Sequence, residues 1–394
     1  MRKFVKYTLA VFLLVFLIFF SLGGKFADRY MNKVETLNNY EPSLHAKQLH
    51  RDLIIADLHA SNLLWDRDLT TTTSHGMVDL AKLISGNYTL QVFDAVTKSP
   101  KNLNYYSNST HSDNITLLSA ANRWPIQSWF SLYHRALHQS ELLKSAVQKS
   151  SQLDLILTQD DLNYFLRLRK NNSYKIGAIL SLKGLHALEG NFQNLNSLFE
   201  AGYRIMGLVH FFDNDIGGSS LGESKQGLTD FGKRIIREME KKEIIIDLAH
   251  ASTNLIKDVL KIVKRPVIVS HTGVKGSFDS PNNLSDADLE AIAKNGGLVG
   301  IGFWKEAVGS IHPTSIAAAI RYTSDLIGVD HVALGSDFDG AVTTSFDASK
   351  IILITEALIQ ENFSDEEIKK IMAVSYTHLR AHETSLHLVC RLLL

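Results

Sequence analysis

Six short apolar segments of this chain end at a polar residue that could take part in chemistry. The segments are LIIADL before His59, KIGAILSL before Lys183, RIMGLV before His210, EIIIDLA before His250, PVIVS before His271 and HVALGS before Asp337. Five of these six residues are His or Asp, the ligand types of a hydrolytic zinc site. The sequence therefore predicts a metal site whose ligands are spread along most of the chain.

The same segments indicate how such distant residues would meet. Short runs rich in Ile, Val and Leu are typical of strands buried on both faces. Two further runs, 89–94 and 297–303, have the same character, and helical patterns lie between the runs at 129–150, 194–201, 229–242, 285–295 and 313–327. This alternation predicts an α/β fold, a (β/α)8 TIM-type barrel. In such a barrel the carboxyl ends of the strands converge on one mouth, where catalytic groups lie.

Composition excludes some classes of function and constrains the site. Lys plus Arg and Asp plus Glu each number 41 in 394 residues, so the net charge is zero and a general nucleic-acid binder is disfavoured. The one cysteine, Cys390, lies near the end of the chain. The body therefore has no thiolate metal site and no disulfide framework. A metal would be held by His, by carboxylate or by a modified side chain.

The first 33 residues differ from the rest of the chain. Arg2, Lys3 and Lys6 precede an apolar stretch at residues 7–24, which predicts a signal peptide or a membrane anchor. No clear A-x-A cleavage site follows, so we favour an uncleaved anchor. The catalytic body is then expected on the periplasmic or extracellular side of the membrane.

Residues 34–372 are expected to form the barrel, and residues 373–394 form an atypical tail. The tail has a leucine-rich end, and we interpret it as non-native or disordered. The alternative is a metal-binding tract made of His378, His382, His387 and Cys390.

Ordered motifs then indicate a family. DLHASNLLWDRDL, HALEGN, GLVHFFDNDIGGSS, GLTDFGKRIIREM, IIIDLAHAS, VIVSHTGVKG, NLSD and HVALGSDFDG follow one another between residues 50 and 372. Together they resemble the membrane (renal) dipeptidase family, and most closely its bacterial branch. The resemblance implies a zinc-dependent metallodipeptidase with an amidohydrolase-like barrel. It also implies two zinc ions bridged by a carboxylate and a hydroxide, a small peptide substrate and a homodimer.

Roles carry over from the resemblance to matching positions. His59 matches the histidine ligand of the first strand, and His250 and His271 match the pair that binds the second zinc ion. His210 matches the histidine that polarises the substrate carbonyl. Asp337 matches the aspartate beside the metals, a candidate proton shuttle.

Three positions depart from the family pattern. Ser61 stands where the His-x-Asp motif has a metal-binding carboxylate, and Lys183 stands at the place of the bridging glutamate. Asn282 stands where an arginine would bind the substrate carboxylate. Asn282 can hydrogen-bond a carboxylate but cannot form a bidentate ion pair with it.

These departures leave several interpretations open. The protein could be a hydrolase with one metal, or a non-catalytic binding barrel that retains at most one metal. Lys183 could also react with CO₂ to form a carbamate, which is anionic and could bridge two metals. A fourth interpretation is an amide or lactone hydrolase whose substrate lacks a free carboxylate, which would suit Asn282.

Overall fold

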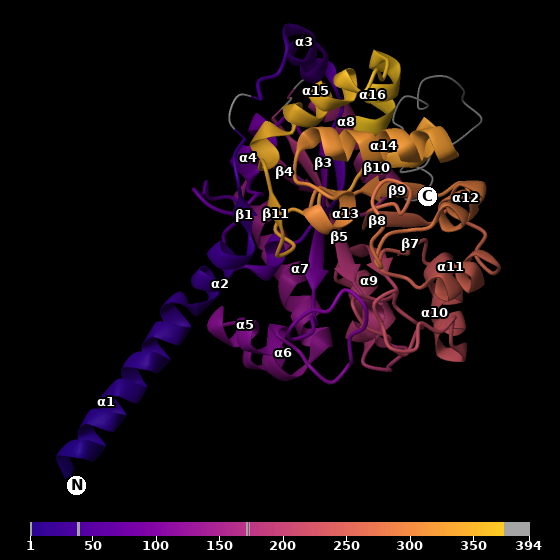
Figure 1. The fold of residues 1–394 in the computed structure, drawn as a ribbon. Helices are drawn as coiled ribbons and strands as arrows, with labels where there is room; N and C mark the ends of the chain where they lie inside the picture. Colours follow the sequence, from indigo (N-terminus) through magenta and orange to yellow (C-terminus); the bar gives the residue numbers. More distant parts are fainter. Residues whose placement is uncertain (1, 38–39, 171, 173, 374–394) are drawn as a thin grey trace.

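Parallel strands close into a barrel in the computed structural model, which describes residues 2–37, 40–170, 172 and 174–373 (Figure 1). The strands are β2 (Ala56–Ala60), β3 (Leu90–Val96), β5 (Ile176–Lys183), β6 (Tyr203–Gly207), β7 (Ile245–Asp247), β8 (Ile268–Thr272), β9 (Leu298–Ile301) and β10 (Val332–Leu334). Their order is β3-β2-β10-β9-β8-β7-β6-β5, and pairing of β3 with β5 closes the ring. The short strand β4 (Leu153–Leu155) pairs with the start of β5. The predicted (β/α)8 barrel is confirmed.

Helices surround the barrel as the alternating pattern requires (Figure 1). They are α3 (Leu44–Asp52), α4 (Leu80–Ser85), α5 (Ile115–Ala121), α6 (Ile126–Phe130), α7 (Leu132–Lys149), α8 (Gln159–Arg169), α9 (Asn194–Glu200), α10 (Asp230–Lys241), α11 (Thr253–Leu260), α12 (Asp286–Lys294), α13 (Lys305–Val308), α14 (Pro313–Ile327), α15 (Ile352–Gln360) and α16 (Asp365–Met372). The helix predicted at 129–150 is two helices, because Ser131 ends α6 and caps α7 with its side chain.

The barrel interior is layered. Every strand of the ring contributes to one apolar cluster, which also contains Leu162 and Phe165 of α8. Its strand members include Val92, Ile179, Ile245 and Ile268. Since side chains alternate along a strand, the residues two positions further on also face the interior. These are Asp94, Ser181, Asp247 and Ser270, which form a polar layer between the apolar floor and the mouth.

The N-terminal segment reaches the barrel. It comprises α1 (Arg2–Ile18), the π-helical turn η1 (Phe19–Gly23) and α2 (Gly24–Met31), and Lys3–Met31 is long and apolar enough to cross a membrane. Figure 1 shows α1 projecting away from the barrel while α2 lies against it. The next strand, β1 (Lys33–Val34), pairs in parallel with β11 (Thr343–Thr344). The anchor and the boundary near residue 33 stay predictions.

A buried ion pair holds α2 in place. Arg67 Nε lies 2.9 Å from Asp28 Oδ2, and Arg67 Nη2 lies 2.8 Å from Asp339 Oδ2. Asp339 also accepts hydrogen bonds from the backbone N–H groups of Met77 and Val78, so it has a structural role. The four predicted tail ligands, His378, His382, His387 and Cys390, lie outside the described residues.

We predict that His50, at the end of α3, makes stability depend on pH. His50 is buried, with Nδ1 2.8 Å from Thr355 Oγ1, and burial lowers its pKa to about 4. The unfolded chain has a histidine pKa of about 6.5, so the stabilisation is complete above that pH and is lost as the pH falls towards 4. Between pH 7 and 4.5 the wild type should lose about 2–3 kcal/mol more unfolding free energy than His50→Gln. Urea unfolding of both proteins measures this, and equal losses would contradict it.

Candidate metal centre

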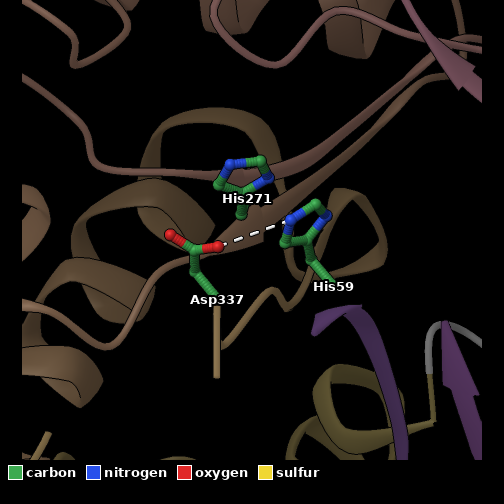
Figure 2. Close-up of side chains that lie close together, drawn as sticks. All are labelled: His59, His271 and Asp337. Carbon is green, nitrogen blue, oxygen red and sulfur yellow. Dashed lines mark ion pairs between the residues drawn. The ribbon is translucent and has the colours of Figure 1, made fainter. Parts of the chain in front are cut away.

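Three predicted residues from separate strands meet at the barrel mouth. His59 belongs to β2, His271 belongs to β8, and Asp337 follows β10. One ligand atom from each lies within 4.8 Å of the others (Figure 2). His59 Nε2 is 3.4 Å from Asp337 Oδ1, and the rings of His59 and His271 stack with centroids 3.8 Å apart. This cluster can hold one metal ion.

Hydrogen bonds beneath the cluster set the tautomers of its histidines. Ser270 Oγ donates its one proton to Asp247 Oδ2 at 2.6 Å, so Ser270 Oγ can only accept a hydrogen bond from the nearby histidine rings. It lies 2.9 Å from His271 Nδ1 and 3.4 Å from His59 Nδ1. Both rings are therefore protonated at Nδ1, and both present the Nε2 lone pair that a metal requires.

His250 extends the cluster on one side. Its Nε2 lies 3.0 Å from His271 Nε2, and it follows β7 in the left-handed conformation, with φ of 63°. Burial, together with the ammonium of Lys183, lowers the pKa of His250 to about 3, so the ring is neutral at pH 7. With the His271 lone pair facing it, the neutral ring of His250 donates from Nε2, and a metal held by His271 would replace this hydrogen bond.

His210 lies beside His250, with ring centroids 4.9 Å apart. Its Nδ1 is 2.9 Å from the carbonyl oxygen of Lys98, which can only accept, so the proton is on Nδ1. Its Nε2 is buried and has no hydrogen-bond partner among the described residues. In the neutral ring, Nε2 is therefore an acceptor aimed at the site.

Lys183 places a cation inside the cluster. Its Nζ lies 3.2 Å from Asp337 Oδ1, and only 6% of the residue is exposed. Ser61 Oγ lies 3.4 Å from His59 Nε2 and is a neutral hydroxyl. At the two positions where the family pattern has carboxylates, this chain therefore has one positive and one neutral side chain.

Sequence reasoning missed two buried carboxylates of the polar layer. Asp94 Oδ1 accepts from Ser181 at 2.9 Å, and its Oδ2 lies 3.6 Å from His59 Nε2. Burial raises the pKa of Asp94 to about 8, although Lys183 opposes this shift. Asp94 ends the run at 89–94 and Asp247 lies within EIIIDLA, so the strand-end rule that found the histidines could have found both.

The donor set fits one metal ion and does not fit two. His59, His271 and Asp337 supply two neutral nitrogens and a carboxylate, as in catalytic zinc sites. A second ion would need a bridging anion where Lys183 lies, and an ammonium repels it. The bridging carbamate of Lys183 stays a prediction.

A cavity of about 700 Å³ opens above the cluster, and its lining includes Ser61, Lys183, His210, His250, Asn282 and Asp337. His59 and His271 do not line the cavity but contact two residues that do, Ser61 and His250. Asn282 is fixed by Ser220, whose Oγ donates to Asn282 Oδ1 at 2.7 Å. The amide nitrogen of Asn282 is then available to donate. All eight residues singled out from the sequence are thus close to one mouth.

Comparison with known proteins agrees with the family resemblance of the sequence motifs. Residues 44–380 match the family described as membrane dipeptidase, peptidase family M19. The chain is 28% identical over 264 residues to Dipeptidase verJ of Clonostachys rogersoniana, covering 65% of this chain and 67% of that protein.

Two solved structures share the fold. The probable dipeptidase PvdM of Pseudomonas aeruginosa has a TM-score of 0.69 at 19% identity, over 86% of this chain and 98% of that one. A metallo peptidase of Rhodobacter sphaeroides, liganded with a phosphinate mimic of L-Ala-D-Ala, has a TM-score of 0.65 at 20% identity, over 82% and 97% of the two chains.

We predict that restoring the two carboxylates raises the zinc content. The double variant Ser61→Asp, Lys183→Glu should bind about two zinc ions per chain, against about one for the wild type, because it replaces a buried ammonium with an anion. Elemental analysis of the purified proteins measures this. The control is Lys233→Glu, an exposed charge reversal that should leave the zinc content unchanged. Equal zinc in wild type and double variant would show that Lys183 does not limit metal binding.

Proposed function

This chain belongs to the membrane dipeptidase family, peptidase family M19, and from that premise we propose that it hydrolyses dipeptides or related small amides with a single zinc ion. The observation that carries the proposal is the cluster of His59, His271 and Asp337, of which Asp337 lines a cavity large enough for a substrate. A cavity of about 700 Å³ is typical of small-molecule sites.

Different residues of the chain would have different roles in hydrolysis. A bound zinc ion would supply Lewis acidity and a water molecule of lowered pKa. His59 and His271 would hold the ion through Nε2, and Asp337 through one carboxylate oxygen. The other oxygen of Asp337 would take a proton from the attacking water and deliver it to the leaving amine nitrogen as the C–N bond breaks. The products are a carboxylic acid and an amine.

Lys183 and Asn282 would bind the substrate rather than the metal. The ammonium of Lys183 can donate to an amide carbonyl oxygen, where negative charge develops during attack. The amide nitrogen of Asn282 can donate to a second carbonyl. Neither interaction requires a free carboxylate on the substrate.

One observation favours a second function, a non-catalytic binding barrel. Lys183 Nζ lies 3.2 Å from the same Asp337 oxygen that faces His59, so the ammonium competes with a metal for this carboxylate. If Asp337 pairs with the Lys183 ammonium rather than with a metal ion, the site has no metal and the cavity is only a binding site.

We further propose that the apolar N-terminal helix keeps the barrel on the outer face of a membrane. The support is one helix, Lys3–Met31, whose length and composition suit a membrane span. Arg2, Lys3 and Lys6 at its start favour a cytoplasmic N-terminus.

Metal removal tests the proposed hydrolysis. Dipeptide cleavage by the full chain should be lost after dialysis against a chelator and restored by zinc. Asp337→Asn should lower kcat/KM by about 100-fold or more, the usual contribution of a proton-transfer group. Asp230→Asn, on the exposed start of α10, is the matched control and should have wild-type activity. No cleavage by the zinc-loaded wild type would favour the binding barrel.

Asn282 should set the preference between free and capped substrates. Without an arginine, the wild type should cleave a dipeptide amide at least as well as the free dipeptide. Asn282→Arg should raise kcat/KM for the free dipeptide relative to its amide by about tenfold, since a hydrogen bond to a charged group contributes about 1.5–3 kcal/mol. Steady-state kinetics on both substrates measures the ratio, and an unchanged ratio would place Asn282 away from the substrate terminus.

A further inference from the structure

The cavity above the metal cluster has a second, apolar end. Its polar end contains Lys183, His210, Asn282 and Asp337. The other end is built by side chains from η1, α2, α5 and neighbouring loops, among them Phe19, Ala27, Leu103, Ile115, Leu118 and Val342. A dipeptide of small residues would occupy only the polar end. The apolar end requires another explanation.

One side of the apolar end is formed by the N-terminal helix, which is held against the barrel by specific contacts. Asp28 of α2 is paired with Arg67, and Asn32 Oδ1 accepts from the backbone N–H of Ala341 at 2.9 Å. At Gly24, a Cβ would lie 1.7 Å from Asn122 Oδ1, so only glycine allows this close approach of α2 to the end of α5. These contacts fix the N-terminal helix as one side of the cavity.

The membrane span proposed for this helix would place this wall of the cavity at the edge of a bilayer. Its uncharged stretch lies between Lys6 and Lys25, which is about the length that spans a hydrocarbon core. Phe19 and Gly23, which line the cavity, lie in the last turns of that stretch. In that arrangement the cavity would begin where the helix leaves the membrane.

The rim of the cavity is exposed and apolar on this side. Leu117 and Met31 line the cavity yet are 57% and 41% exposed. Next to the rim, α6 presents Ile126 and Phe130, which are 68% and 82% exposed, and Phe20 of η1 contacts Trp129 of the same helix. These exposed apolar side chains give an acyl chain a surface over which to enter the cavity.

The polar end suits an amide head group. His210 Nε2 is buried without a hydrogen-bond partner among the described residues, so it is available to a ligand. The lone pair of His210 Nε2 can accept from an amide N–H. Lys183 and Asn282 can donate to carbonyl oxygens. Because Asn282 is neutral, it does not require a carboxylate on the ligand.

We propose that this cavity binds single-chain N-acyl amides, with the amide at the metal cluster and the acyl chain along the wall formed by Phe19, Ala27 and Leu118. The proposal deepens the proposed function, and only its hydrolytic part rests on it. In that part, water adds to the acyl carbonyl carbon, the C–N bond breaks, and a fatty acid and an amine leave. The proton from water ends on the amine nitrogen.

A chain-length series tests the proposal. The probes are N-acetyl-, N-hexanoyl- and N-decanoyl-L-alaninamide, titrated calorimetrically into the full chain in lipid nanodiscs, with empty nanodiscs as the partition blank. Affinity should rise about fourfold per buried methylene, hence roughly 100-fold or more from six to ten carbons. Affinity that is independent of chain length in the wild type would overturn the proposal.

Two variants locate the chain in the cavity. Ala27→Phe fills the apolar end and should flatten the dependence on chain length. Ser21→Phe adds a comparable volume on the exposed side of the same N-terminal segment and should keep the dependence on chain length. Near-UV circular dichroism checks that both variants are folded. If the affinity of folded Ala27→Phe still rises steeply with acyl chain length, the proposal is also overturned.

Cleavage of the same probes separates this proposal from the proposed function. Chain-length-dependent binding without cleavage of any probe or dipeptide would refute hydrolysis and support the binding proposal. Dipeptide cleavage with no effect of chain length would support hydrolysis and refute the binding proposal.

Discussion

The contact between the Lys183 ammonium and the Asp337 carboxylate is the interaction on which the rest of this site depends. Both groups are buried, and the separation is 3.2 Å. At that distance the two buried charges stabilise each other. Removing either partner would leave an unpaired buried charge, which would strongly destabilise the folded protein. Lys183 therefore neutralises the carboxylate that a metal would also use. It limits the number of cations that the mouth can accept, and it would be a fixed donor for the carbonyl oxygen of the proposed substrate.

The polar layer below this pair orients the site. Asp247 and Ser270 fix the protonation of His59 and His271, so that both rings present lone pairs to one point. The apolar floor beneath excludes water and raises the energetic cost of every unpaired charge above it. The retained histidines and the altered carboxylates are thus parts of one consistent charge arrangement, with fewer anions than two zinc ions would need.

The barrel and the histidines could be predicted from the sequence because both depend on local pattern. Short apolar runs mark the strands, and parallel strands bring their ends together whatever lies between them. Asp94 was missed because the residues singled out were those that follow an apolar run, whereas Asp94 is the last residue within the run at 89–94. The place of α2 could not be predicted either. Hydropathy marks the helix as apolar, whereas its position depends on the long-range pair of Asp28 with Arg67 and on the close contact at Gly24.

Anomalous diffraction at the zinc edge, on crystals of the zinc-loaded full chain, tests the central claim most directly. One peak among His59, His271 and Asp337, with Lys183 as a free amine, is the predicted result. Two peaks bridged by a carboxylated Lys183 would contradict the single-metal account.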